Sequence, residues 1–465
     1  MTQHHRNRFS GSVGFILAAA GSAVGLGNIW RFPYLAAKDG GGLFLVLYVI
    51  LAVTFGFTLL TTEIAIGRKT KQSPLTAYTH IRKGWGFLGI FSCIVPMMIL
   101  PYYCSIGGWV LKYFAAFLTG DAAAAAEDTY FTGFITGTTW PIVFFVIFLL
   151  MTAAAIFRGV NKGIESVSRI LMPVLAILVL AIAIFSLTLT HTDADGTVRT
   201  GLQGLRIFVI PDLTGQTIGS FFGVMVDAMG QMFYSLSVAM GILIAYGSYV
   251  RDDDNLMRSI NMIEIFDTLI AFLAGVMIIP AVYSFMGTEG MKASGPSLMF
   301  VALPKVFSAM GGIGSVVGCL FFAMVLFAAV TSSISIMEAI VSSFMDQFHL
   351  QRDKATVIIL IYTLVVGVLV CLGYNKLYFE LTLPNGATAQ ILDVLDYISN
   401  NILMPIVAIG TCLLIGWAAG PKTIIDEVTK NGSRFGRRRL YIVMIRFIAP
   451  VLLIILFLNA LGILH

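Results

Sequence analysis

Long apolar stretches dominate this sequence, and short polar or charged segments separate them. A membrane-spanning helix needs about 20 mostly apolar residues, which these stretches provide. A β-barrel would instead alternate apolar and polar residues in segments of about ten, so the pattern excludes that class. The sequence therefore predicts an all-α polytopic membrane protein with eleven spans, at about 11–38, 42–68, 86–118, 140–157, 165–190, 219–250, 258–284, 314–346, 353–374, 390–417 and 440–463.

The composition supports the same class, because 58% of the 465 residues are hydrophobic and 11% are charged. A soluble protein with a mean hydropathy of +0.91 would expose large apolar patches to water. The five cysteines lie in apolar stretches without metal-ligand spacing, which is typical of small buried side chains. The polar N-terminus leads into a span without a small-residue cleavage site, so we expect no cleaved signal peptide.

Basic residues are unevenly distributed among the loops. Alternate loops are rich in Lys and Arg, whereas residues 119–139 contain three acids and no base. By the positive-inside rule the N-terminus is cytoplasmic, and eleven spans place the C-terminus outside. The net charge of +5 then reflects cytoplasmic loops, and no nucleic-acid partner is expected. The basic residues on the inner side are Arg6, Arg8, Arg68, Lys69, Lys71, Arg82, Lys83, Arg158, Lys162, Arg169, Lys422, Lys430, Arg434, Arg437, Arg438 and Arg439.

The first span contains flexible and polar residues where a continuous helix is expected. It holds Gly21, Gly25 and Gly27, followed by Asn28 and Arg31. Glycine lowers the cost of non-helical backbone, and opened backbone in a membrane is tolerated only where protein or a watery cavity satisfies it. This segment therefore predicts a broken helix that lines a site.

A second interruption lies in the sixth span, at residues 230–241, where Ser and Gly recur. If five helices are repeated as an inverted pair, the first and sixth spans are equivalent. Interruptions at matching positions of two halves point to the binding site of a transporter. Alone, the second interruption is weak evidence, because Ser and Gly also occur at ordinary contacts between membrane helices.

Ionisable residues within membrane spans are costly and usually functional. Among them, the carboxylate of Asp267 requires a cation, and Na⁺ takes oxygen ligands of the kind that Asn28, Ser235 and opened backbone offer. The alternative is that Asp267 is protonated or hydrogen-bonded for packing. The hydroxyls of residues 331–333 leave a similar choice between a cation site and bonds to the preceding helical turn. The ionisable set is Arg31, Glu63, Asp227, Asp267 and Asp396, with Asp346 at the inner end of the eighth span.

Several segments together resemble one known family over about residues 9–463. They are residues 25–34 (GLGNIWRFPY), 231–237 (QMFYSLS), 295–298 (GPSL) and 331–334 (TSSI), with Gly163 and Pro173 matching a pattern in the fifth span. On these residues the sequence resembles the neurotransmitter:sodium symporters, in their bacterial, LeuT-like branch. The segment from Gly295 to Pro304 could then form a small lid over an outward opening or be an ordinary connector.

The resemblance implies a single transporter domain over residues 1–465. In it, residues 11–190 and 219–417 form two inverted repeats of five helices, and residues 440–463 add a further C-terminal helix. It also implies two Na⁺ sites, the first formed by Ala23, Asn28, Ser235 and Asp267, and the second by Gly21, Val24, Ala328, Thr331 and Ser332. The implied amino acid site comprises Ala23, Gly25, Gly27, Ile99, Tyr103, Tyr234, Ser237, Met240 and Ile336.

The resemblance further assigns gates and supports. Arg31 and Asp396, with Gln231 beside them, match the outer gate, and Arg6 and Asp346 match the inner gate. The alternative for these charges is snorkelling at helix ends. Glu63 matches a buried acid that braces the sixth span, and Asp227 is expected to be a structural residue of the outer vestibule.

Two departures from the family concern chloride. Many members have Asn in place of Asp267, and chloride-dependent relatives have Ser in place of Ala271. Chloride supplies a negative charge near Na⁺ in those relatives, whereas Asp267 supplies a fixed one here. We therefore expect no chloride requirement.

The predicted function is sodium-coupled import of a neutral, hydrophobic or aromatic L-amino acid by alternating access across the cell (inner) membrane. The apolar or aromatic pocket positions Ile99, Tyr234, Met240 and Ile336 favour such a substrate. A proton-coupled or exchange-type transporter of the same fold, a non-transporting amino acid sensor and a channel remain open as alternatives. No nucleophile–base pair, phosphate loop or metal motif is present in the sequence, so it does not predict an enzyme.

Overall fold

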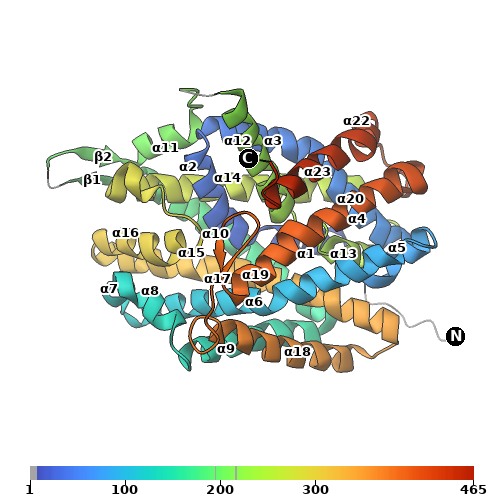
Figure 1. The fold of residues 1–465 in the computed structure, drawn as a ribbon, viewed down its shortest axis with the longest axis horizontal. Helices are drawn as coiled ribbons and strands as arrows, with labels where there is room; N and C mark the ends of the chain where they lie inside the picture. Colours follow the sequence, from blue (N-terminus) through green and yellow to red (C-terminus); the bar gives the residue numbers. More distant parts are fainter. Residues whose placement is uncertain (1–7, 194, 215–216, 465) are drawn as a thin grey trace.

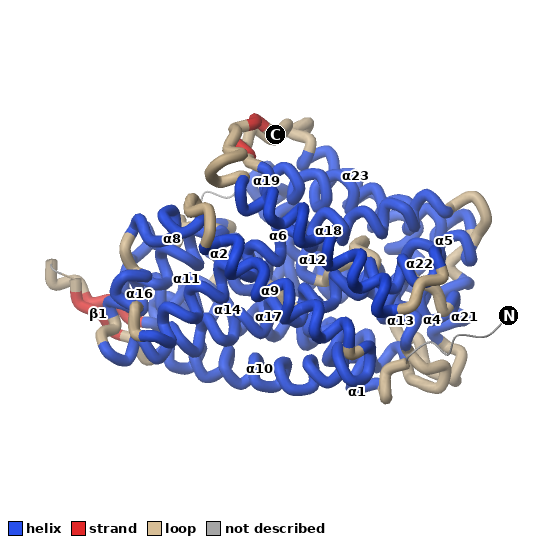
Figure 2. Tube along the Cα trace, turned by 90° about the horizontal axis from the view of Figure 1, so that it is seen from below, coloured by secondary structure: helices blue, strands red, loops and turns tan. Residues whose placement is uncertain are grey.

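The computed structural model describes residues 8–193, 195–214 and 217–464. Helices dominate this part of the chain and pack side by side (Figure 1 and Figure 2). Two short antiparallel hairpins lie in connecting segments, with Thr190 paired to Thr200 in one and Leu381 paired to Ala389 in the other. The hairpin strands are β1 (Thr190–Thr192), β2 (Val198–Thr200), β3 (Leu381–Thr382) and β4 (Thr388–Ala389).

The helices of the first 190 residues include three π-helical turns, labelled η. They are α1 (Ser12–Ala23), η1 (Gly27–Arg31), α2 (Phe32–Lys38), α3 (Gly42–Leu51), η2 (Ala52–Gly56), α4 (Phe57–Thr70), α5 (Pro74–Ile81), α6 (Gly86–Thr119), α7 (Ala122–Ala125), α8 (Asp128–Ile135), α9 (Trp140–Phe157), η3 (Val160–Glu165) and α10 (Ser166–Leu187).

The remaining helices follow in the same way. They are α11 (Gly201–Val209), α12 (Ile218–Ser235), α13 (Ile242–Tyr249), α14 (Leu256–Gly290), α15 (Gly295–Ser297), η4 (Leu298–Ala302), α16 (Leu303–Ala309), α17 (Gly312–Phe348), α18 (Arg352–Leu372), α19 (Ile391–Asp396), η5 (Tyr397–Leu403), α20 (Met404–Leu413), η6 (Leu414–Ala418), α21 (Lys422–Val428), α22 (Arg438–Val443), η7 (Met444–Ile448) and α23 (Ala449–Ala460).

Helices occupy all eleven ranges that the sequence predicts to span the membrane. Within the described ranges, nine helices are long and apolar enough to cross a membrane, and the bent pair Ser12–Ala23 and Gly27–Lys38 makes a tenth span. The predicted sixth span consists of α12 and α13, two shorter helices separated by residues 236–241. The total of eleven spans therefore stays a prediction at that position.

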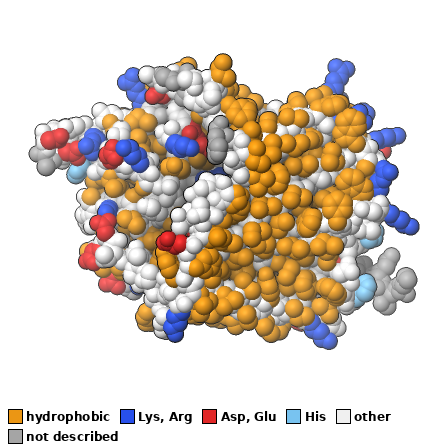
Figure 3. Space-filling model, in the orientation of Figure 1, with side chains coloured by type: hydrophobic (Ala, Val, Ile, Leu, Met, Phe, Trp, Pro, Cys, Tyr) orange, Lys and Arg blue, Asp and Glu red, His pale blue; other side chains and the backbone are white. Residues whose placement is uncertain are grey.

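The surface of the molecule divides into an apolar band and charged ends. Figure 3 shows a broad hydrophobic area, with Lys and Arg side chains projecting from the right-hand end and charges of both signs at the left-hand end. Exposed Ile170, Ile177 and Ile184 in α10 illustrate the apolar band, since each is more than half accessible. This distribution is the one that a bilayer requires of a protein surface.

Close backbone contact joins α4 to α13. A Cβ atom on Gly67 would lie 2.1 Å from the carbonyl oxygen of Ile244, and one on Gly247 would lie 2.3 Å from that of Ile64. Small residues allow membrane helices to approach in this way. The two helices therefore pack with no room for a side chain at these positions.

Ion pairs join the segment after η6 to α4 and α14. The Arg68 guanidinium in α4 lies 2.7 Å from the Glu427 carboxylate in α21. Arg437, just before α22, lies 2.7 Å from Glu264 in α14. Two ion pairs thus attach the segment from Glu427 to Arg437 to α4 and α14.

The segment with the candidate lid is helical and packed. Residues Gly295–Ala309 form one short apolar helix. Its Phe300 ring stacks on Phe131 at a centroid distance of 5.0 Å and also contacts Trp30 and Trp109. The segment is therefore anchored in an aromatic cluster.

Candidate functional site

The first span breaks where the glycines predict it. α1 ends at Ala23 and η1 begins at Gly27, and the two halves are bent by 52°. The break brings backbone close to other helices, since a Cβ atom on Gly25 would lie 3.0 Å from the Ser332 hydroxyl and one on Gly27 would lie 2.9 Å from the Tyr234 ring. Glycine at both positions therefore leaves space in the centre of the molecule.

The sixth span breaks between Ser235 and Ile242, opposite the first break. Ser237 and Ala239 adopt left-handed backbone with φ of 53° and 63°, which is unfavourable for residues with a Cβ atom. The buried Glu63 carboxylate of α4 accepts a hydrogen bond of 2.6 Å from the Ala239 N–H. Glu63 therefore satisfies backbone that the break exposes, at the position where the sequence places a brace.

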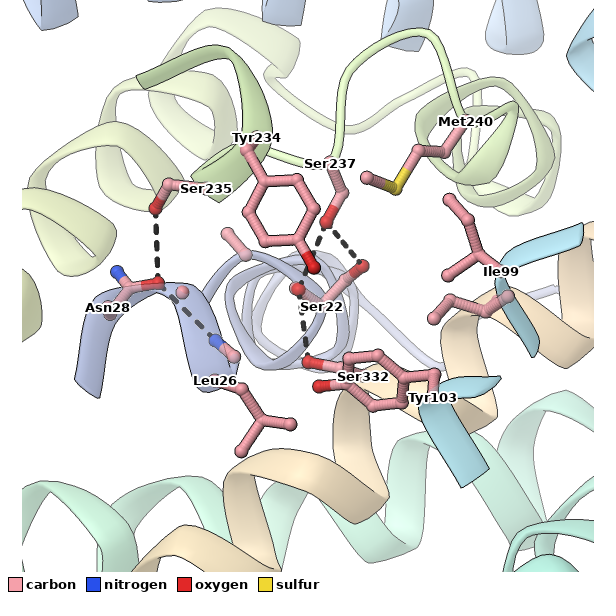
Figure 4. A pocket seen from close by; sticks show the side chains of 14 residues that line it. Ser22, Leu26, Asn28, Ile99, Tyr103, Tyr234, Ser235, Ser237, Met240 and Ser332 are labelled. Carbon is pink, nitrogen blue, oxygen red and sulfur yellow. Dashed lines mark hydrogen bonds between the residues drawn. The ribbon is translucent and has the colours of Figure 1, made fainter. Parts of the chain in front are cut away.

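A central cavity of about 30 Å³ lies between the two breaks (Figure 4). All nine residues predicted for the substrate site line it. One end is apolar, where Ile99, Met240 and Ile336 gather, and the Tyr103 hydroxyl at the other side is buried without a hydrogen-bond partner among the described residues. Five further residues line the cavity, namely Ser22, Leu26, Asn28, Ser235 and Ser332.

Asn28, Ser235 and Asp267 meet beside this cavity. The Asn28 amide donates to Asp267 Oδ1 at 2.8 Å, and the Ser235 hydroxyl lies 2.9 Å from the same oxygen and 3.1 Å from Asn28 Oδ1. Asp267 is fully buried, and its Oδ2 has no hydrogen-bond partner in the described chain. A buried carboxylate oxygen without a donor, next to an amide and a hydroxyl oxygen, suits a hard cation.

Tyr48 is a neighbour of Asp267 that sequence reasoning missed. Its buried hydroxyl faces Asp267 and Ser235 from α3. A tyrosine in the middle of an apolar span gives no polar pattern, so only the packing of α3 against the site reveals it.

The second predicted cation set lies between α1 and α17. The Thr331 hydroxyl bonds to the carbonyls of Phe327 and Ala328 at 3.0 and 3.1 Å, which is the back-bonding alternative. The Ser332 hydroxyl instead reaches α1 and donates to the Gly21 and Ser22 carbonyls, each at 3.2 Å. Of the predicted set, the structure thus joins Ser332 to Gly21 and Thr331 to Ala328, and Val24 follows α1 as its C-terminal cap.

Comparison with known proteins decides the family. The family model described as the sodium:neurotransmitter symporter family matches residues 6–133 and 132–464. This chain belongs to the sodium:neurotransmitter symporter family. The chain is therefore a sodium-dependent symporter and a multi-pass membrane protein, and members of this family are transporters rather than enzymes. The family and the all-α fold predicted from the sequence are confirmed.

Individual relatives agree with this assignment. The symporter is 32% identical, over the full length of both chains, to an uncharacterized sodium-dependent transporter, YhdH, of Bacillus subtilis. It is 26% identical to the human sodium- and chloride-dependent GABA transporter 2, over 91% of this chain and 75% of that one. The crystal structure of MhsT in complex with L-phenylalanine matches with a TM-score of 0.84 and 33% identity, over 98% of this chain and 100% of that chain.

The predicted outer gate residues lie together at one side of the central cavity. Arg31 lies over the Tyr234 ring at 6.0 Å from its centroid, and Asp396 accepts hydrogen bonds from Tyr102 at 2.9 Å and Asn400 at 2.6 Å. Within the described part of the symporter, Arg31 and Asp396 form no ion pair with each other. The Gln231 amide donates to the Gly27 carbonyl at 3.1 Å.

A second cavity of about 170 Å³ adjoins these residues, and Arg31, Asp227 and Tyr234 line it. Tyr234 lines both cavities, so its ring separates them. Asp227 forms an ion pair of 2.7 Å with Lys38. Burial and the negative charge of Asp227 raise the pKa of nearby Asp39 to about 7, although the positive charge of Lys38 opposes this shift.

Polar contacts surround the predicted inner gate residue Asp346 and the nearby end of α17. The predicted gate residue Arg6 lies outside the described residues, and Asp346 accepts a hydrogen bond of 2.6 Å from the Ser73 N–H. Sequence reasoning missed a second carboxylate, Glu338, which is fully buried and bonds Arg352 through both oxygens at 2.7 Å. Its position as an acid within the eighth predicted span was the signal that could have identified it.

Gly163 and Pro173 lie in the fifth span. Gly163 belongs to η3, and a Cβ atom there would lie 1.9 Å from the Ala155 carbonyl oxygen. Pro173 lies inside α10, after the fully buried Met172. The Met172 sulfur would be 3.0 Å from a Cβ atom on Gly21, so this part of α10 covers the second predicted cation set.

Proposed function

We propose that this sodium-dependent symporter imports a neutral, hydrophobic or aromatic L-amino acid. The observation that carries the proposal is the central cavity, which combines an apolar end at Ile99, Met240 and Ile336 with opened backbone at the two breaks. The solved structure of MhsT, which contains L-phenylalanine, supports an amino acid in this cavity. Met is unbranched and adaptable, so a range of apolar side chains fits beside Met240.

The charged groups of an amino acid match the polar parts of the cavity. The N-terminal end of η1 at Gly27 offers N–H groups, and Tyr103 has a free hydroxyl, so both suit the substrate carboxylate. The opened C-terminal end of α1 offers carbonyl oxygens, which suit the ammonium group. A zwitterion therefore lies across the first break, with its side chain toward Met240.

We further propose two Na⁺ ions as co-substrates. The Ala23 carbonyl, Asn28, Ser235, Asp267 and the substrate carboxylate would hold the first ion. The Gly21, Val24 and Ala328 carbonyls with Thr331 and Ser332 would hold the second. Each ion that moves inward gains roughly 2.3 kcal/mol per 100 mV of membrane potential, which drives accumulation of the substrate.

The transport cycle follows from the inverted repeat. Residues 11–190 and 219–417 would form the two repeats, with 440–463 as an extra helix. Arg31, Gln231 and Asp396 would close the outer side, and Arg6 and Asp346 the inner side, in alternation. In this proposal the symporter resides in the cell (inner) membrane with its N-terminus in the cytoplasm and its C-terminus outside.

A competition panel in proteoliposomes tests the substrate. With an inward Na⁺ gradient, we expect uptake of labelled L-phenylalanine, and we expect the aromatic and large aliphatic L-amino acids to compete at least tenfold better than charged ones. Uptake that persists when K⁺ replaces Na⁺, or uptake driven by a proton gradient alone, would contradict sodium coupling. Counterflow of preloaded substrate separates transport from sensing.

Replacement of chloride by gluconate should leave uptake unchanged within about twofold. The reason is that the fixed charge of Asp267 supplies the anion near the first Na⁺. The measurement compares initial rates of Na⁺-driven uptake in matched NaCl and sodium gluconate buffers. A several-fold fall in gluconate would show that this symporter requires chloride.

A further inference from the structure

A groove of about 440 Å³ opens between α1 and α14 at the end of the molecule where both helices begin. Its deeper wall is apolar and consists of Val13, Ile16, Leu17, Met262 and Phe266. Val13 is 60% exposed and Met262 is 44% exposed, so the apolar wall is open to the surroundings. Both helices belong to membrane spans, so the groove faces lipid rather than water.

The mouth of the groove is polar and positively charged. Ser12, Asn255, Arg258 and Ser259 line it, one turn or less from the starts of the two helices. Arg258 is exposed and forms no ion pair with any described residue. The N-terminal helix ends that flank it add partial positive charge.

Nearby acids do not neutralise Arg258. In the preceding loop, Asp252 lies 3.0 Å from Lys71, and Asp253 lies 2.6 Å from Arg251. Asp254, whose Oδ2 has no hydrogen-bond partner among the described residues, forms no ion pair with Arg258 either. The Asn255 side chain accepts a bond of 3.0 Å from the backbone N–H of Arg258 and does not engage its guanidinium. An anion at the mouth would therefore meet an uncompensated positive charge.

We infer that this groove is a binding site for an anionic phospholipid. The phosphate group lies at Arg258, and one acyl chain runs along the wall from Val13 to Phe266. The positive charge at the mouth matches the phosphate headgroup, and the apolar wall behind it matches an acyl chain. Headgroup and chain follow in the same order in a bilayer. Because α1 forms one side of the groove and also carries the first break, the lipid supports the helix half that leads to the central cavity.

Lipid retention by the full-length protein tests the inference. The symporter is reconstituted in nanodiscs of phosphatidylglycerol and phosphatidylcholine, extracted in mild detergent, and analysed by native mass spectrometry. We expect one retained phosphatidylglycerol, and we expect Arg258→Gln to lower its preference over phosphatidylcholine by about fivefold, which is the usual contribution of one basic residue near an anionic membrane surface.

Two further variants separate the groove from general effects. Met262→Trp fills the apolar wall and should remove the retained lipid while Arg258 is intact. Arg434→Gln removes an exposed arginine outside the groove and should retain phosphatidylglycerol as the parent does. Equal retention by the parent, Arg258→Gln and Met262→Trp overturns the inference. It is also overturned if lipid binds only after deletion of residues 2–7, because the chain's own N-terminus would then cover the groove.

Discussion

Asp267→Asn is expected to raise the Na⁺ concentration that half-saturates substrate binding by roughly 30-fold, equivalent to about 2 kcal/mol. The substitution keeps the size of the side chain and its contacts with Asn28 and Ser235 but removes the buried negative charge. Contacts to a charged group are stronger than contacts between neutral groups. Loss of the Asp267 charge should therefore weaken mainly the binding of the cation. Scintillation proximity binding of labelled substrate over a Na⁺ titration measures the shift.

A matched control separates charge at the site from charge in general. Asp353 is exposed in the first turn of α18, and Asp353→Asn should leave the Na⁺ dependence as it is in the parent. Substrate binding by Asp267→Asn at saturating Na⁺ shows that the variant is folded. If such a folded variant keeps the parent's Na⁺ affinity, Asp267 is not a sodium ligand.

Gly67→Ala is expected to destabilise the protein strongly although alanine favours helices by about 1 kcal/mol over glycine. The added methyl group would lie 2.1 Å from the Ile244 carbonyl oxygen and 2.9 Å from the Ser248 nitrogen. Both neighbours are backbone atoms of α13, so α4 and α13 would have to separate, and overpacking of this kind typically costs about 1–3 kcal/mol. The unfolding temperature in detergent, followed by intrinsic fluorescence, should fall by several degrees.

Gly133→Ala in α8 is the control for helix propensity. No atom lies within 4 Å of a Cβ atom at Gly133, so this change should leave the unfolding temperature equal or slightly higher. A Gly67→Ala protein that is as stable as the Gly133→Ala protein would mean that α4 and α13 do not pack as described.

Some parts of the fold and the site can be predicted from the sequence, and others cannot. Apolar length determines most spans, because hydrocarbon requires it, but α12 and α13 carry the polar residues of the site and lack that length. Gly25 and Asn28 predict the first break, because both residues are costly in an apolar helix. Ligand chemistry suggests Asn28 and Ser235 as partners of Asp267, but their distance in the sequence gives no sign of contact, and the resemblance to the family supplies it.

Several contacts of the site could not be predicted from the sequence, because the residues that form them are of common types at unremarkable positions. Tyr48 lies in an apolar stretch that gives no sign of a polar role. Its proximity to Asp267 depends on how α3 packs against the site. The pairing of Glu338 with Arg352 joins a span to the loop that follows, where Arg352 looks like any basic residue at a helix start. The polar contacts of Asp396 with Tyr102 and Asn400 likewise come from packing of α6 on η5.

The tight fit of α13 on α4 has a mechanical consequence. Glu63 holds the broken backbone at Ala239, and Gly67 and Gly247 prevent one helix from sliding along the other. We therefore expect α13 and α4 to move together as one rigid unit. Because Arg68 at the end of α4 forms an ion pair with Glu427, a movement of this helix pair would also move α21 (Lys422–Val428).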